Sequence, residues 1–507
     1  MVYLVGIDVG TTNTKAVVYD PERGEVIALG RHPTRTYHPR PGWSEFDPAQ
    51  IWQGVAESLR QALAQVPSTA SIAGVGVSSM GEAGIPIDAS GEYLYPIIAW
   101  YDPRAEPQLD ALCRKLGTYE IFDITGQSPR NIFSLPKIVW LQEHHPDIVR
   151  RAGRWLCMED FVIWKLSGEY ATDYSVASRT LAFDQRQRFW SSRILGSVGL
   201  SADLFPMPFP SGTAVGRVTA KAAEETGLPI GAPVVTGGHD HLVGALAVGV
   251  LAEGEVLDST GTAEAVLAPL SFYRPDRRLF DSGFSFYHHT VRGQYVVIGG
   301  NSAGGASVDW LSRSVLGLEE GPSKEFFAAA AEVAAGSQGL FFLPHLVGSG
   351  TPENDAASRG AFVGLTPFHN RGHFARAVLE GVCYWLRSNL DEIESIVGKR
   401  IAEITAIGGA TQSPFWLQLK ADVTGRSVRV PHVPEAVAVG AALLAGCGVG
   451  LFANERQAAA SVNAFQEVRK PDEKEAAAYE RWYEEVYKSL YASLRDSHHR
   501  IQQAFGS

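Results

Sequence analysis

The chain has 507 residues, of which 45% are hydrophobic and 20% charged, so it has the composition of a folded globular protein and the length for two domains. Its 44 basic and 55 acidic side chains give a formal charge of −11 with no offsetting basic block, which argues against a nucleic-acid partner. No window approaches 18 uncharged apolar residues and no basic leader precedes the first strand, so we expect neither a membrane span nor a signal peptide.

The cysteines indicate a reducing compartment. They lie far apart, without metal-binding spacing, at Cys113, Cys157, Cys383 and Cys447. We interpret them as buried thiols, and together with the missing leader they predict a cytoplasmic protein.

The N-terminal segment predicts a β-hairpin with a polar turn. An apolar run ends at Asp8, and a second apolar run begins after Lys15. Between them lie Gly10, Thr11, Thr12 and Asn13. Backbone N–H groups, hydroxyls and one cation can bind an anion, and the acid can hold Mg²⁺ through its water molecules. This pattern indicates nucleotide chemistry; the alternative is an ordinary Gly-Thr hairpin.

Strand-like and helix-like segments then alternate through the first half of the chain. We expect helices over 51–64, from 136 to 144 and over 241–250, and strands over 72–77 and 234–236. After Gly254 a second strand and turn resemble the first, with Asp258 followed by Gly261 and Thr262. We interpret this as an internal repeat with a domain boundary near 252–254. The alternative is a coincidence between two short turns.

Three glycine clusters lie in the second half. They are 299–305 before a helix with Trp310 and Leu311, the loop 348–350, and Gly408-Gly409-Ala410 between a strand over 404–407 and a helix over 414–424. A glycine turn between strand and helix can present N–H groups to a phosphate. Close backbone packing is the alternative for a single cluster.

Apolar residues from 472 to 494 follow helical spacing. They predict a terminal helix packed on its domain, with homodimerisation as the less favoured interpretation.

Two longer motifs identify a family. Gly360–Leu365 followed by His373–Glu380 fits a C-terminal signature, and Ser134, Lys137 and Trp140 fit an N-terminal one from which Ile132 departs. The chain thereby resembles the FGGY carbohydrate kinases, a branch of the actin-like ATPases. The resemblance implies two actin-like (ribonuclease H-like) α/β domains, 1–252 on the sugar side and 253–507 on the nucleotide side, with a central cleft.

The resemblance also implies ATP and Mg²⁺ as cofactors and assigns residues to them. Asp8 would be the metal-side acid. The phosphates would meet Gly10, Thr11, Thr12, Asn13 and Lys15 from one domain and Gly261 and Thr262 from the other. Gly305, Gly408, Gly409 and Ala410 would carry the α-phosphate and the nucleoside.

Asp240 would be the catalytic base that takes the proton of the acceptor hydroxyl. It stands at the carboxyl end of a predicted strand and directly before a helix, where α/β folds place their sites. Phosphoryl transfer needs a carboxylate within reach of the attacking hydroxyl. The alternative role for Asp240 is a helix N-cap.

The acceptor side departs from familiar relatives. Met80, Gly81 and Glu82 stand where glycerol kinases place an Arg-Glu pair and xylulokinases a Met-His pair. Loss of the arginine opens space and favours an acceptor larger than a triol. Glu82 can accept from sugar hydroxyls, or it is a solvated loop carboxylate. No cation is evident near it in the sequence.

Three further residues are predicted at the acceptor. Trp100 matches a pocket-wall tryptophan of relatives, although a core tryptophan would look the same. His239 and His241 flank Asp240 and could donate to a sugar hydroxyl, and a charged one would lower the pKa of Asp240. The alternative is that both point away. In 348–352, the family's frequent Glu-Arg pair is absent, so this loop is expected to pair the domains differently.

We therefore predict an ATP-dependent kinase that phosphorylates a terminal hydroxyl of a small-molecule ketose or polyol, a pentulose or hexulose. A kinase for a sugar acid such as gluconate is one alternative and would need a cation near Glu82. A non-enzymatic actin-like ATPase switch is the other, and it would need no acceptor base.

Overall fold

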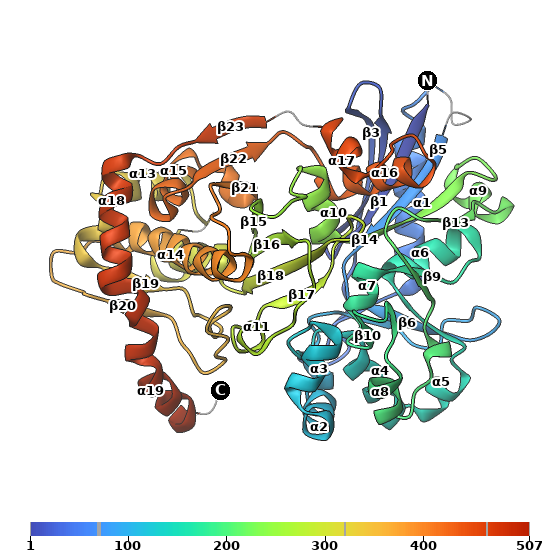
Figure 1. Ribbon diagram of the computed structural model, residues 1–507, viewed down its shortest axis with the longest axis horizontal. Helices are drawn as coiled ribbons and strands as arrows, with labels where there is room; N and C mark the ends of the chain where they lie inside the picture. The colour runs from blue at the N-terminus through green and yellow to red at the C-terminus, as the bar shows by residue number, and fades with distance from the viewer. Residues whose placement is uncertain (1, 68–71, 319–320, 463–464, 506–507) are drawn as a thin grey trace.

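The computed structural model describes residues 2–67, 72–318, 321–462 and 465–505, and a large sheet lies in each half of the chain (Figure 1). The first has the strand order β13-β14-β5-β1-β2-β3. Its strands are β1 (Tyr3–Val9), β2 (Asn13–Asp20), β3 (Glu25–Pro33), β5 (Ile72–Ser79), β13 (Ala214–Arg217) and β14 (Pro233–His239). Strand β1 pairs antiparallel with β2 and parallel with β5, which confirms the predicted hairpin.

The second sheet repeats this arrangement. Its order is β17-β18-β16-β15-β21-β22-β23. Its strands are β15 (Val256–Thr260), β16 (Glu264–Leu270), β17 (Ser285–His288), β18 (Tyr295–Asn301), β21 (Glu403–Gly408), β22 (Ser427–Pro431) and β23 (Phe465–Arg469). Strand β15 pairs antiparallel with β16 and parallel with β21, as β1 does with β2 and β5. The two predicted turns therefore occupy equivalent places in the two sheets.

Shorter strands and the helices surround these sheets. The short strands are β4 (Glu45–Phe46), β6 (Gly84–Ile87), β7 (Ile97–Ile98), β8 (Arg154–Cys157), β9 (Ala171–Asp173), β10 (Phe183–Asp184), β11 (Phe189–Trp190), β12 (Met207–Phe209), β19 (Phe341–Leu343) and β20 (Ala361–Val363). The earlier helices are α1 (Pro48–Leu63), α2 (Glu106–Leu116), α3 (Thr118–Thr125), α4 (Ser134–His144), α5 (Pro146–Arg151), α6 (Met158–Ser167), α7 (Tyr174–Ser178), α8 (Ser192–Ser197), α9 (Ala220–Thr226) and α10 (Asp240–Ala247). The later ones are α11 (Arg277–Asp281), α12 (Gly304–Asp309), α13 (Lys324–Ala331), α14 (Arg371–Val397), α15 (Pro414–Thr424), α16 (Ala436–Gly448), α17 (Glu455–Ala460), α18 (Glu473–Trp482) and α19 (Lys488–Phe505).

One glycine cluster differs from its predicted place. Gly299 and Gly300 lie inside β18, where they pair with Val266 and Ala265, and α12 begins only at Gly304. The strand continues because its neighbour β16 offers backbone partners through this stretch.

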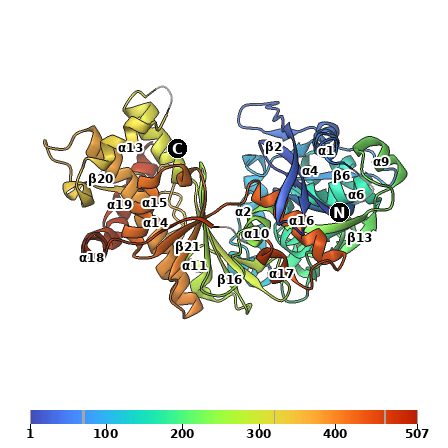
Figure 2. The same cartoon turned by 90° about the horizontal axis from the view of Figure 1, so that it is seen from above.

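Helix α16 packs on the first sheet although it lies late in the chain. It contacts β1, β5 and β14, and Figure 2 shows α16 and α17 among the N-terminal elements. Two strand glycines permit this approach: a Cβ at Gly6 would lie 1.8 Å from the Ala438 carbonyl oxygen, and one at Gly76 would lie 2.0 Å from that of Ala441. The division of the chain at residue 252 stays a prediction.

The terminal helices α18 and α19 run on through a π-helical turn, Tyr483–Tyr487. Tyr479, Tyr483, Tyr487 and Leu490 are buried in the core of the second half, as the helical spacing predicted. Dimerisation stays an untested alternative. Within the described ranges, no helix has both the length and the apolar character needed to cross a membrane.

The Gly76→Ala variant should be destabilised. A methyl group there would meet the Ala441 carbonyl, and overpacking of this kind costs about 1–3 kcal/mol, which lowers the melting temperature by several degrees. Differential scanning calorimetry measures the change. Gly196→Ala is the matched control, because a Cβ there meets open space on a helix and should be neutral or slightly stabilising. An unchanged melting temperature in Gly76→Ala would contradict the packing account.

Candidate active site

Two cavities meet at the turn between β15 and β16. One, of about 460 Å³, lies in the second half, and the other, of about 430 Å³, extends between the halves. Gly261 and Thr262 line both. We call them the second-half cavity and the central cavity. The two cavities therefore adjoin at this turn.

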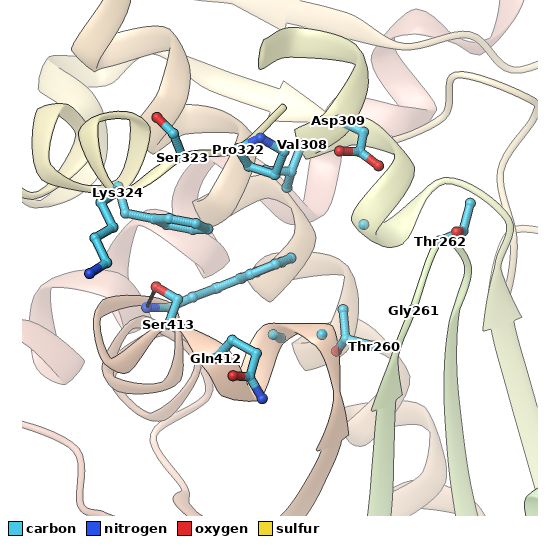
Figure 3. A pocket seen from close by; sticks show the side chains of 15 residues that line it. Thr260, Gly261, Thr262, Val308, Asp309, Pro322, Ser323, Lys324, Gln412 and Ser413 are labelled. Atoms are coloured by element: carbon cyan, nitrogen blue, oxygen red, sulfur yellow. Dashed lines mark hydrogen bonds between the residues drawn. The ribbon is translucent and has the colours of Figure 1, made fainter. Parts of the chain in front are cut away.

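Aromatic and polar side chains line the second-half cavity. Among its lining residues are the predicted Gly305, Gly409 and Ala410, joined by Asp309, Lys324, Phe327, Ser413 and Trp416. The rings of Phe327 and Trp416 lie 6.3 Å apart, and Figure 3 shows Lys324 and Ser413 both at the left of the cavity, with Asp309 and Thr262 at the right. Lys324, Phe327 and Trp416 were not predicted from the sequence. Trp416 could have been found, because it lies in the first turn of the predicted helix that follows a glycine cluster.

Close packing accounts for two of the predicted glycines. A Cβ at Gly305 would lie 2.2 Å from the Gly261 carbonyl oxygen, and the Gly305 N–H already donates to that oxygen at 3.1 Å. Gly408 has a φ of +89°, and a Cβ there would lie 2.4 Å from the Thr260 carbonyl oxygen. By contrast, a Cβ at Gly261 or Gly409 would have no neighbour closer than 3.6 Å. These two glycines keep the cavity wall open.

The predicted acceptor residues all meet at the central cavity. Its lining includes Thr11, Met80, Gly81, Glu82, Trp100, His239, Asp240 and His241. The indole N–H of Trp100 donates to Thr11 Oγ1 at 3.1 Å, so the predicted pocket wall contacts the predicted phosphate turn. Sequence segments separated by 89 positions are thus joined at one site.

Two residues of the N-terminal signature hold the walls of this cavity. Ser134 Oγ donates to the Glu82 carbonyl oxygen at 2.7 Å. The buried Lys137 ammonium group donates to four backbone carbonyls, those of Trp100, Asn131, Ile132 and Phe133. Burial lowers the pKa of Lys137 to about 7. The signature residues therefore fix the loops that carry the acceptor side chains.

A cation does lie beside Glu82, contrary to the expectation from the sequence. The Nε of Arg179, from the end of α7, donates to Glu82 Oε1 at 2.6 Å, and Nη2 contacts the same oxygen. Glu82 is only 4% exposed, so the solvated-loop alternative is wrong. A desolvated carboxylate is stable only when paired, and residue 179 lies 97 positions away in sequence.

The space beside Gly81 is also filled, contrary to expectation. A Cβ at Gly81 would lie 3.0 Å from His239 Cδ2 and 3.1 Å from Arg179 Cγ. The guanidinium group that the sequence lacks at position 81 therefore enters from position 179. The missing arginine at position 81 gives no argument for a larger acceptor.

A second arginine, Arg130, spans the central cavity. Its Nη2 donates to the Gly283 carbonyl oxygen at 3.3 Å and to Asn354 Oδ1 at 3.1 Å. Burial and the charge of Arg179 lower its pKa. Both partners come from the second half, and Asn354 lies two residues beyond the loop 348–352 that is predicted to pair the domains differently. Neither partner is charged.

Asp240 is the first residue of α10, so the alternative that it is the N-cap of this helix is wrong. The N-cap position is His239, and Asp240 Oδ1 accepts from the adjacent His241 N–H at 2.6 Å. The Asp240 side chain is 29% exposed. It is thus a partly accessible carboxylate in the wall of the cavity that Gly261 and Thr262 enter.

His239 does not carry the charge considered from the sequence. Burial and the neighbouring Arg179 and His241 hold its pKa well below the usual range. Its ring lies over Gly81, with Nε2 3.3 Å from Asp240 Oδ1, so it does not point away. His241 lines the cavity with its ring centroid 5.4 Å from that of His239.

The first turn holds surplus negative charge. Asp8 is 7% exposed, and burial together with the Asp240 and Glu435 carboxylates outweighs Lys15 and raises the pKa of Asp8 to about 7. The Lys15 ammonium group pairs with Glu435 Oε2 at 2.5 Å. In the same turn the Gly10 N–H donates to the Asn13 carbonyl oxygen at 3.0 Å, and Thr12 is exposed. Phosphate contacts from these residues stay a prediction.

Comparison with known proteins gives the family. The model of the N-terminal domain of the FGGY family of carbohydrate kinases matches residues 3–247, and that of the C-terminal domain matches residues 259–449. The chain belongs to the FGGY family of carbohydrate kinases. It is 31% identical to a xylulose kinase of Lactococcus lactis subsp. lactis, over 99% of both chains, and 30% identical to a glycerol kinase of Thermococcus gammatolerans, over 96% of this chain and 98% of that one.

Solved structures give the same result for the fold. A xylulose kinase from Rhodospirillum rubrum superposes with a TM-score of 0.90 at 29% identity, covering 98% of this chain and 100% of the other. The predicted α/β architecture with two actin-like domains is therefore confirmed, and so is the prediction of an ATP-dependent sugar kinase. The ATPase-switch alternative is not supported.

The Asp8→Asn variant should stabilise the ligand-free protein increasingly as pH rises. The pKa of Asp8 is about 7 in the fold against 3.8 unfolded, so ionisation above pH 3.8 favours the unfolded chain until the folded pKa is passed. The difference in free energy of unfolding between variant and wild type should grow from pH 4 to 7, by at most about 1.4 kcal/mol per pH unit, and then level off, and the difference in melting temperature should follow the same course. Asp147→Asn, at an 81% exposed side chain, is the control and should show no such trend. A pH-independent difference would contradict the assignment.

Proposed function

We propose that the enzyme transfers the γ-phosphoryl group of ATP to a terminal hydroxyl of an open-chain ketose or polyol, with a pentulose as the first acceptor to test. One observation carries the proposal: Asp240 and the Gly261–Thr262 turn line one cavity, and that turn also lines the second-half cavity. An acceptor beside Asp240 would lie next to the phosphates of a nucleotide bound in the second-half cavity. The xylulose kinases among the relatives support a pentulose.

In this proposal Asp240 is the general base. Its carboxylate would accept the proton of the acceptor hydroxyl as that oxygen attacks phosphorus, and a positioned base of this kind contributes about 10²–10⁴-fold to rate. Gly261 and Thr262 would orient the transferred group from one side and Thr11 from the other. The Phe327 and Trp416 rings would enclose the nucleoside. Glu82, Arg179 and Trp100 would hold the acceptor.

Asp8 fits a magnesium ion. It is a buried carboxylate beside a second carboxylate, Asp240, and its nearest cation is paired with Glu435. Among the described residues, no cluster of three or more His, Cys, Asp or Glu side chains could ligate a metal, so Mg²⁺ would take its other ligands from phosphate oxygens and water. When bound, the ion supplies charge neutralisation on the phosphates.

A sugar acid is the second candidate acceptor, and Arg130 favours it. Its side chain is half-buried, lines the central cavity and donates to two neutral oxygens, while the charge of Arg179 is matched by Glu82. No ion pair links Arg130 to a carboxylate among the described residues. A substrate carboxylate would supply the missing charge.

We also propose a cytoplasmic location. The four cysteines are free thiols, which suits a reducing compartment.

The Asp240→Asn variant should lose turnover while keeping ATP affinity. The amide is nearly isosteric but cannot accept the hydroxyl proton, so kcat should fall by about 10²–10⁴-fold. A coupled ADP assay with xylulose, glycerol and gluconate gives kcat, and titration with a fluorescent ATP analogue gives the Kd. Near-normal turnover in the variant would refute the role of Asp240. ATP hydrolysis unaffected by every acceptor in the wild type would refute the sugar-kinase proposal.

The Arg130→Met variant separates the two acceptor classes. If a sugar acid is the substrate, loss of the cation should raise KM for gluconate by about tenfold or more, because a charge-assisted hydrogen bond is removed. KM for neutral xylulose should change little. The measurement is steady-state kinetics on both acceptors with both proteins. Preference for xylulose together with an unchanged KM for gluconate in the variant would eliminate the sugar-acid candidate.

A further inference from the structure

His239 lies between a tyrosine of the second half and the carboxylate of Asp240. The Tyr287 hydroxyl, on β17, is 3.2 Å from His239 Nδ1, and His239 Nε2 is 3.3 Å from Asp240 Oδ1. His239 ends β14 of the first sheet, and its own N–H donates to Ser175 Oγ at 2.9 Å. Tyr287 and His239 are both buried, at 0% and 4% exposure. The contact between Tyr287 and His239 therefore joins the two halves of the chain at a place that is closed to solvent.

The partners of His239 decide which ring nitrogen carries its hydrogen. A neutral imidazole has one donor and one acceptor nitrogen. The carboxylate of Asp240 can only accept, and Nε2 lies 3.3 Å from its Oδ1, so this contact favours the tautomer with the hydrogen on Nε2. Nδ1 is then the acceptor, and the Tyr287 hydroxyl must donate to it. With the opposite tautomer, a lone pair would face the carboxylate.

The same contacts distinguish the two oxygens of Asp240. Oδ1 accepts from the His241 N–H at 2.6 Å and faces His239 Nε2 at 3.3 Å. Oδ2 has neither of these donors, and the side chain is 29% exposed to the cavity. Oδ2 is therefore the oxygen left to receive a proton from an acceptor hydroxyl.

We propose that Tyr287 is a positioning residue which, by fixing the tautomer of His239, orients Asp240 with Oδ2 toward the acceptor. The proposal rests on the proposed function of Asp240. Because Tyr287 belongs to the second half and His239 to the first, the base is set only when the halves are in contact.

We call the contacts from Tyr287 through His239 to Asp240 the relay, and several charged or titratable groups surround it. His239 faces Arg179, His241, Asp240 and Tyr287. Tyr287 faces Arg179, Glu82, Asp240 and Asp173, and burial raises its pKa, so it stays a protonated donor through the neutral range. The Arg179 guanidinium lies 5.6 Å from the Tyr287 ring centroid. Among the described residues, the Tyr287 hydroxyl is the one hydrogen-bond partner of His239 Nδ1.

The first test is Tyr287→Phe, which removes the hydroxyl and keeps the ring. Without its donor, His239 is free to change tautomer, and a lone pair instead of an N–H then faces Asp240 Oδ1, which disfavours the charged form of the carboxylate. We expect kcat to fall about tenfold, the acidic limb of kcat/KM to move to higher pH, and the KM for ATP to stay unchanged. Tyr273→Phe is the matched control, because the Tyr273 hydroxyl is buried without a hydrogen-bond partner. An unmoved acidic limb in Tyr287→Phe would overturn the proposal, even if the melting temperature falls.

A second measurement needs no substrate. ¹⁵N chemical shifts of the imidazole nitrogens report the tautomer, with the His239 signals assigned by their loss in His239→Gln. We expect protonated Nε2 and acceptor Nδ1 in the wild type, and a changed ratio in Tyr287→Phe. Protonated Nδ1 in the wild type would overturn the inference whatever the activity, whereas a wild type that phosphorylates no acceptor would overturn only the proposed function.

A double variant, His239→Gln with Tyr287→Phe, tests whether the two residues act through each other. In the His239→Gln background the relay is already broken, so adding Tyr287→Phe should change kcat by much less than tenfold. Fully additive losses would show that the two residues act independently and would contradict the relay.

Discussion

Charge buried around the central cavity must be paired or hydrogen-bonded, and this constraint explains why the cavity is built from such distant parts of the chain. Burying an unpaired ion costs several kcal/mol, so a cavity that needs polar groups must also supply their partners. Glu82 has Arg179, and Lys137 has four backbone carbonyls. Each pairing joins two loops, so the charges that line the cavity also fix the shape of its walls.

The same constraint separates charged from neutral groups. His239 lies beside Arg179 and is uncharged, because a second buried cation there would be unmatched. Around Asp8 the excess charge is negative, because Lys15 is paired with Glu435 and the carboxylate of Asp240 lies nearby. The turn therefore offers phosphate few free cations, and a nucleotide there would depend on backbone N–H groups and a divalent ion. A chain with a formal charge of −11 must gather its positive groups in this selective way.

Local features of the fold could be predicted because they depend on neighbouring residues. The two hairpins, the helix over 414–424 and the terminal helix follow from hydrophobic spacing and from glycine and proline positions. Asp240 and Glu82 could also be predicted as site residues from the sequence, because each follows a buried strand. Arg179, Arg130 and Tyr287 carried no such signal. Arg179 reaches the cavity from the end of α7 and Arg130 from a loop, whereas Tyr287 on β17 lies behind the wall against His239. Only the packing of those elements determines where an arginine or tyrosine points.

Misinterpretations of the acceptor site had a common physical origin. Gly81 suggested open space, because a sequence position without a side chain looks empty. In a close-packed interior such space is filled by whatever lies opposite, here His239 and Arg179. Arg179 also supplies the forked donor that position 81 lacks, so one substitution in a motif changes the source of a guanidinium rather than removing it. In the proposed function, residues 80–82, 179 and 239–241 would therefore have to be considered together, with Trp100 and Arg130, to explain which acceptor is bound.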